Sequence, residues 1–156
     1  TGEKLYRRSL YTFWRRIVGP TMFFDNAARQ TCVVKTTCTN TPLQALVTMN
    51  ETTYVECARA MAQRVLTDST LAGDTERFAS AWKRATAREP KLPELKSLVF
   101  SLEKFRAKFA ADAKAADELL MIGDSKRDAR LNATEHAAWT SVCLMIMNLD
   151  EVLNKE

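Results

Sequence analysis

The residues best suited to chemistry lie in one irregular, basic stretch near the N-terminus. Asp25, Arg29 and Cys32 place a carboxylate, a guanidinium and a thiol close together in the sequence. A nucleophilic cysteine would need nearby cations to lower its thiol pKa. The only histidine, His136, is far away in sequence, so a Cys/His pair would depend on the fold. We therefore favour the structural alternative, a loop held together by an Asp–Arg hydrogen-bonded pair.

The same stretch could instead bind a small ligand or an anion, because arginine side chains offer several donors to anionic groups. The candidate ligand-binding residues around residues 19–44 are Arg15, Arg16, Asp25, Arg29, Cys32, Asn40 and Gln44. The sequence contains no Gly-rich phosphate loop, no paired acidic motif and no metal-binding helix. We accordingly expect no catalytic residue, no metal site and no cofactor in this chain, and incline against an enzyme.

The four cysteines, Cys32, Cys38, Cys57 and Cys143, include no Cys-x-x-Cys motif. Structural zinc sites and haem attachment both use such closely spaced ligands, so neither is expected. Cys32 and Cys38 are near enough in sequence to close a small disulfide loop in an oxidising compartment. Because the residues alone do not identify the compartment, we favour free thiols in a packed loop over this disulfide.

Basic and aromatic residues alternate near the N-terminus, a pattern that single-stranded nucleic acids can recognise. Residues 1–40 hold seven Lys or Arg and two acidic residues, a net charge of +5, whereas residues 41–156 carry −1. However, helical spacing over residues 7–18 separates Phe13 and Trp14 from Arg8 and Arg15. An amphipathic helix with a solvated basic face is the better interpretation, and nucleic-acid binding is unfavoured.

The remaining pattern predicts helices throughout, in keeping with only four glycines and four prolines. We expect six of them, over residues 7–18, 42–66 with a break at 50–53, 75–87, 93–111, 113–122 and 133–150. The fold class is thus all-α, an irregular bundle with a long N-terminal loop over residues 19–40. A loop of that length is often functional.

Burial follows from the apolar spacing of each expected helix. Leu43, Leu46 and Val47 should bury in the helix that begins at Pro42. The last helix is apolar nearly all round, so we expect it to lie at the centre of the bundle.

Length and composition limit the number of domains and the class of protein. The 156 residues fit one domain, and no apolar run approaches the roughly 20 residues needed to span a bilayer. The sequence opens without a methionine or a signal peptide, so we expect it to be a piece of a larger protein.

Several motifs match a known family. They are residues 7–16 (RRSLYTFWRR), then Phe24, Asp25, Arg29 and Cys32, and residues 39–46 (TNTPLQAL), 85–90 (ATAREP), 138–139 (AW) and 148–151 (NLDE). In these residues the chain resembles a domain of unknown function of planctomycete type. The family has more basic residues just before Thr39, where this chain has Thr36, Thr37 and Cys38. This difference weakens an anion-binding role for that turn.

The resemblance implies a context and no activity. Such domains occur at the C-terminal end of large exported proteins with cytochrome c-like domains, which implies a periplasmic or otherwise exported location. It also implies other domains of the parent as partners and favours a Cys32–Cys38 disulfide. The leading functional hypothesis is a non-catalytic docking module. The alternatives are an enzyme fragment or ligand site at residues 19–44 and, third, nucleic-acid binding.

Overall fold

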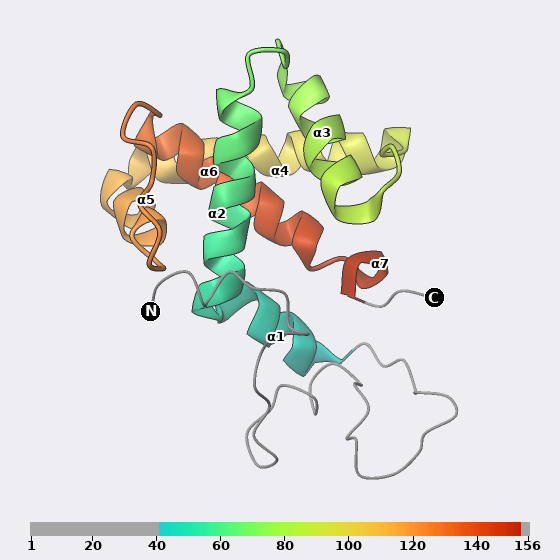
Figure 1. Cartoon of the computed structure of the whole chain (residues 1–156), viewed down its shortest axis with the longest axis horizontal. Helices are drawn as coiled ribbons and strands as arrows, with labels where there is room; N and C mark the ends of the chain where they lie inside the picture. Colours follow the sequence, from blue (N-terminus) through green and yellow to red (C-terminus); the bar gives the residue numbers. More distant parts are fainter. Residues whose placement is uncertain (1–40, 154–156) are drawn as a thin grey trace.

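The computed structural model describes residues 41–153, and these residues form seven helices and no strand. The helices are α1 (Pro42–Asn50), α2 (Thr52–Thr67), α3 (Asp74–Thr86), α4 (Leu92–Ala111), α5 (Ala113–Leu120), α6 (Ala133–Met147) and α7 (Asp150–Leu153). The all-α prediction is confirmed (Figure 1). The helix expected over residues 7–18 and the loop over 19–40 lie outside the described residues.

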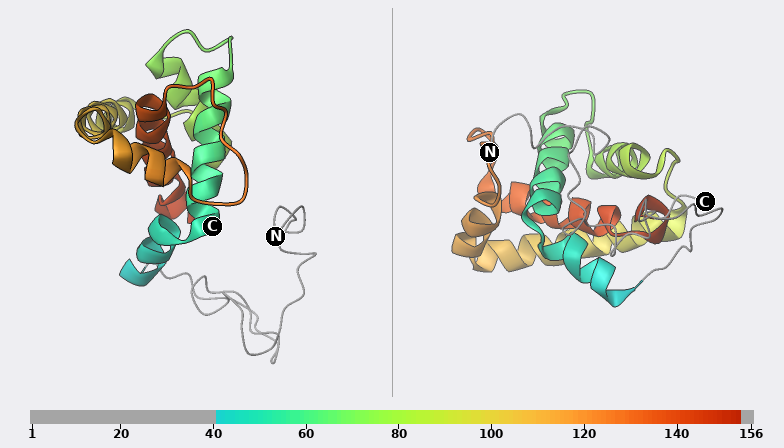
Figure 2. Two further views of the ribbon diagram at one scale, coloured as in Figure 1. Left: turned by 90° about the vertical axis from the view of Figure 1, so that its left-hand side faces the viewer. Right: turned by 60° about the horizontal axis from the view of Figure 1, so that its bottom comes forward.

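Helix α6 is the centre of the bundle, as its apolar sequence predicted. It packs against α2 on one side and α4 on the other, with α5 at one end (Figure 2, left). His136, Trp139 and Val142 are completely buried along it. The helix ends at Met147 rather than near Asp150, and the short α7 follows as a separate element.

The core is built from apolar stripes of the surrounding helices. Phe78 of α3 stacks against Trp139 of α6 with ring centroids 4.8 Å apart. The other buried side chains include Ala58, Ala62 and Val65 of α2, Leu98, Leu102 and Phe109 of α4, and Ala116 and Leu120 of α5. These contacts fix α2, α3, α4 and α5 around the central helix.

The predicted break in the second helical segment is confirmed at Glu51. Its extended backbone ends α1, and its side chain accepts hydrogen bonds from the N–H groups of Thr53 and Tyr54 to cap α2. A side-chain acceptor at this position satisfies the free donors of the first helical turn. Helix α3 has no side-chain cap, because Gly73 occupies its N-cap and Asp74 is already helical.

Helix α1 is oriented opposite to the sequence prediction. Gln44 and Thr48 face inward and are buried, whereas Leu43 and Leu46 are 52% and 58% exposed. Thr48 donates to the Asn148 side chain at 2.5 Å, and this contact ties α1 to the end of α6. The prediction that Leu43 and Leu46 would bury was therefore wrong, because a polar contact with α6 sets which face of α1 points inward.

Candidate functional site

The first candidate site is the outward face of α1. We define the α1 apolar face as Leu43, Leu46 and Met49, which follow each other at intervals of three and are all exposed. Residues three apart are neighbours on one side of a helix, so their side chains form one continuous apolar strip. Solvent-facing strips of this kind on a short helix commonly mark interaction surfaces.

Gln44, one of the predicted ligand-binding residues, is used for capping this helix. Its side-chain oxygen accepts a hydrogen bond from the Thr41 N–H at 2.6 Å, and its own N–H donates to the Thr41 hydroxyl. This reciprocal pair is a capping box. The N-cap is thus Thr41, and Pro42 takes the first helical position, where the sequence predicted the helix to begin.

The other predicted site residues, Arg15, Arg16, Asp25, Arg29, Cys32 and Asn40, lie outside the described residues, and so does Cys38. The ligand site and the Cys32–Cys38 disulfide remain predictions. Cys57 and Cys143 are free thiols, exposed and buried respectively. Within residues 41–153 no cluster of three or more His, Cys, Asp or Glu side chains is placed to hold a metal ion.

The second candidate site is a groove between α2 and α3, which the sequence analysis did not identify. Its volume is about 770 Å³, and the adjoining ends of α6 and α7 complete it. We call it the α2–α3 groove, lined by Glu56, Cys57, Ala60, Met61, Arg64, Arg84, Ala85, Ser125, Met147 and Val152. Its wall is mostly apolar, and its cations are Arg64 and Arg84.

A signal for this groove was present in the sequence of α2. Cys57, Ala60, Met61 and Arg64 recur at helical spacing on one face, beside the buried stripe of Val55, Ala58, Ala62 and Val65. The opposite wall of the groove comes from α3, α6 and α7. The periodicity of α2 alone does not predict that these helices lie beside it.

Cys57 is a slow nucleophile in this groove. Burial is the main cause that raises its thiol pKa, and the carboxylates of Glu56 and Glu51 raise it further, while Arg64 acts in the opposite direction. Since the thiolate is the reactive form, a raised pKa reduces reactivity near neutral pH. The described thiols therefore do not form a nucleophilic site, and burial also raises the pKa of Cys143 to about 12.

A buried polar cluster supports one end of the groove. The Arg59 guanidinium donates to the carbonyl oxygens of Leu120 and Ser125, each at 2.6 Å. Glu56 accepts from the N–H groups of Asp124 and Ser125. The loop over residues 121–132 is thus fixed to α2 through its backbone.

His136 completes this cluster from the central helix. Its Nε2 donates to the Arg59 carbonyl oxygen at 3.2 Å, while Nδ1 is buried without a hydrogen-bond partner among the described residues. Burial lowers the pKa of the imidazole, which keeps it neutral. A neutral imidazole held by a backbone carbonyl on a fully buried side chain is structural rather than catalytic.

Two surface arginines hold the outer helices in place. Arg88 bridges Glu94 of α4 and Glu151 of α7 at 2.7 and 3.0 Å, and lies over the Trp82 ring. Arg106 of α4 bridges Asp74 and Glu135. Glu135 also accepts from the Trp139 indole, and its N–H donates to the Asn132 side chain that caps α6.

The geometry defines an all-α domain with two surface sites and no assembled catalytic group among residues 41–153. A family model for PSD1, a protein of unknown function (DUF1553), matches residues 1–102. The chain belongs to this family. No curated protein and no solved structure matches the chain. None of the helices in residues 41–153 is long and apolar enough to cross a membrane.

Proposed function

We propose that this chain is a non-catalytic docking module within a larger exported, multidomain protein, and that residues 1–156 are one domain of it. The observation that carries the proposal is the polarity of α1. This helix turns Gln44 and Thr48 toward α6 and leaves Leu43, Leu46 and Met49 in water. Keeping such an apolar strip exposed is unfavourable unless another surface covers it.

The partner is another part of the same parent protein. Residues 1–40 precede α1 in the sequence, so polypeptide on its N-terminal side is joined directly to the exposed strip. A tethered partner has a high effective concentration, so a small strip is enough to hold it. The resemblance to domains that accompany cytochrome c-like domains supports such a domain as one neighbour, and an exported location with it.

Site-specific crosslinking in the full parent protein tests this proposal. A photoreactive residue replacing Leu46 should crosslink to another segment of the parent. The matched control replaces Leu92, which is 75% exposed at the start of α4. Crosslinks from position 46 and none from position 92 would support docking through α1. If the photoreactive residue at position 46 also gave no protein crosslink and reacted only with water, docking through α1 would be refuted.

A charge on the strip gives an independent measurement. Leu46→Glu should leave the free energy of unfolding of the isolated chain within about 0.5 kcal/mol, because the side chain is exposed. In the parent protein it should increase amide exchange over residues 42–50. Unchanged exchange in the parent would show that α1 stays uncovered there.

A further inference from the structure

We propose that the α2–α3 groove binds a single-chain amphiphile with an anionic head group, such as a fatty acid. Nothing in the family description assigns a ligand to this chain. The proposal does not depend on docking through α1, since the groove and the α1 apolar face share no residue.

The shape and lining of the groove fit an alkyl chain. Its volume of about 770 Å³ falls in the range of about 300–1,000 Å³ that is usual for small-molecule sites. From Cys57 to Arg64 it follows about 10 Å of helix α2. Small Ala60 and Ala85 leave room at the floor, while Met61, Met147 and Val152 supply an apolar wall. Methionine side chains adapt to flexible ligands.

The two arginines of the groove supply the anion specificity. Neither Arg64 nor Arg84 forms an ion pair with a carboxylate among the described residues, although both line the groove. Helical side chains lean toward the N-terminus of their own helix. Because α2 and α3 run in opposite directions (Figure 1), this tendency directs the two side chains along the groove in opposite senses. Arg84 shows this directly, since its Nε donates to Ser80 one turn back.

The acidic groups nearby are held mainly by other donors. Glu56 accepts from the N–H groups of the loop and pairs with Arg59. Asp68 accepts from the Thr70 backbone and hydroxyl, which is the main cause of its lowered pKa, and the charge of Arg84 contributes less to that lowering. Two guanidinium groups that share one groove repel each other, so an anionic head group placed between them would be stabilised by both.

An outside ligand fits better than the chain's own N-terminal segment. Residues 1–40 carry a net charge of +5, the same sign as the two arginines. An apolar tail with a single negative head satisfies the apolar wall and the cations at once.

Protection of Cys57 measures occupancy of the groove. The intact chain is alkylated at mildly alkaline pH with and without monomeric dodecanoate, and each cysteine is followed separately by peptide mass spectrometry. Dodecanoate should slow alkylation of Cys57, which lines the groove and is exposed. Equal alkylation rates at Cys57 with and without dodecanoate would overturn the proposal.

Head-group and tail controls separate specific binding from nonspecific association. Dodecyltrimethylammonium has the same tail with the opposite charge and should give no protection, while butyrate has the same head and should protect much less. Equal protection by the cationic amphiphile would overturn the proposal. Vesicles of phosphatidylglycerol distinguish the source of the head group: protection by monomeric dodecanoate alone indicates a free amphiphile, and protection by vesicles alone overturns it.

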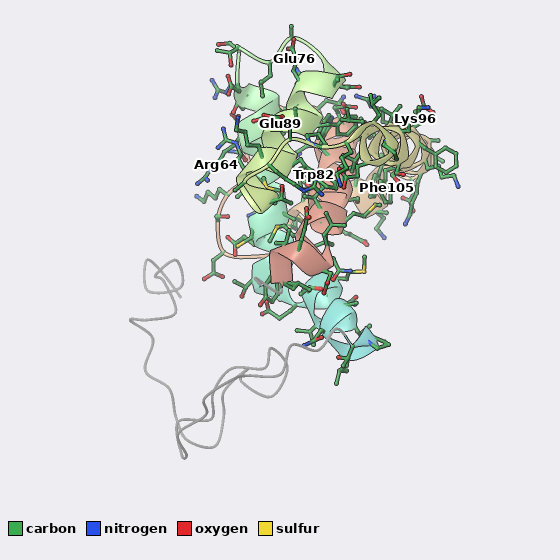
Figure 3. All side chains as sticks on the ribbon, turned by 90° about the vertical axis from the view of Figure 1, so that its right-hand side faces the viewer. Arg64, Glu76, Trp82, Glu89, Lys96 and Phe105 are labelled. Atoms are coloured by element: carbon green, nitrogen blue, oxygen red, sulfur yellow. The ribbon has the colours of Figure 1, made fainter. Side chains whose placement is uncertain are left out.

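Variants locate the head-group contact. Arg64→Gln and Arg84→Gln should each weaken dodecanoate binding about tenfold, as expected for the loss of one charge-assisted hydrogen bond. The matched control is Lys96→Gln, which removes one positive charge on the opposite side of the domain (Figure 3). Ala60→Phe should fill the groove and abolish protection. If Lys96→Gln weakened dodecanoate binding as much as the arginine variants do, the effect would come from net charge alone. That result would refute the site.

Discussion

Gly123 lies directly against the side chain of Glu56: a Cβ atom built on Gly123 would come 2.5 Å from the Glu56 Cδ. Gly123 also has a φ of +98°, a backbone conformation that favours glycine. This contact lets the backbone after α5 turn close enough to α2 for Glu56 to accept from the N–H groups of Asp124 and Ser125.

Gly123→Ala should destabilise the domain by at least about 1 kcal/mol, since it combines an unfavourable φ with a steric clash. Gly73→Ala is the matched control, because its Cβ would meet no atom within 4 Å and its φ is −137°. Urea denaturation should show a clearly lowered midpoint for the first variant and a smaller shift for the second, in which alanine replaces glycine at the N-cap of α3. Equal shifts would show that Gly123 is not constrained by Glu56.

Arg59→Met should cost about 3 kcal/mol or more, the usual effect of removing one partner from a buried charge pair. Arg59 is 3% exposed and supports two loop carbonyl groups, so its loss should also expose residues 121–132 to proteases. Combining it with Glu56→Gln should cost less than the sum of the two single variants. Strict additivity would mean that the two side chains do not act as a unit.

His136 should make the domain sensitive to mild acid. Burial lowers its pKa in the folded state below the ordinary value of 6.5, so the unfolded chain binds the proton more readily. Stability is therefore complete above about pH 6.5 and falls as the pH decreases toward the folded-state pKa. The slope for one proton is at most about 1.4 kcal/mol per pH unit.

Urea titrations between pH 7 and 5 test this slope. His136→Gln keeps a side-chain donor for the Arg59 carbonyl and removes the titrating group, so its stability should vary less over this interval. The ion-paired carboxylates of Glu94 and Asp128 have pKa values lowered to about 2. They therefore stay ionised between pH 7 and 5 and do not contribute to this slope. An identical slope in the variant would exclude His136 as the source.

Arg88→Gln should release α7 from the domain. The substitution removes the ion pairs with Glu94 and Glu151 and the cation over Trp82. Hydrogen exchange over residues 150–153 should accelerate, while exchange in α6 stays slow. The pKa of Glu94, lowered to about 2 by hydrogen bonds from Arg88 and the Lys91 backbone, should rise in the variant. If the exchange rates in α7 did not change, contacts other than those of Arg88 would hold α7 in place.

Local spacing predicted the features that it alone decides. The break at Glu51 and the central position of α6 follow from capping and helical periodicity. The prediction for Leu43 and Leu46 failed because local spacing allows either face of α1 to point inward. The contact between Thr48 and Asn148 decides the orientation.

The candidate sites were less predictable for the same reason. Arg59 falls at a core position in the α2 pattern, yet its partners at Leu120 and Ser125 are more than 60 residues away. The α2–α3 groove joins side chains from four helices and one loop. Such non-local juxtapositions depend on how helices pack, which residue periodicity does not specify.

The central position of α6 has a consequence for the order of folding. Helices α2, α4 and α5 all place their main apolar contacts on a helix that is synthesised after them. Until Trp139 and Val142 leave the ribosome, these three helices have no common surface to pack against. Formation of the native core must therefore wait for almost the last residues that the structure describes, and a chain cut before Ala133 should remain without a stable core.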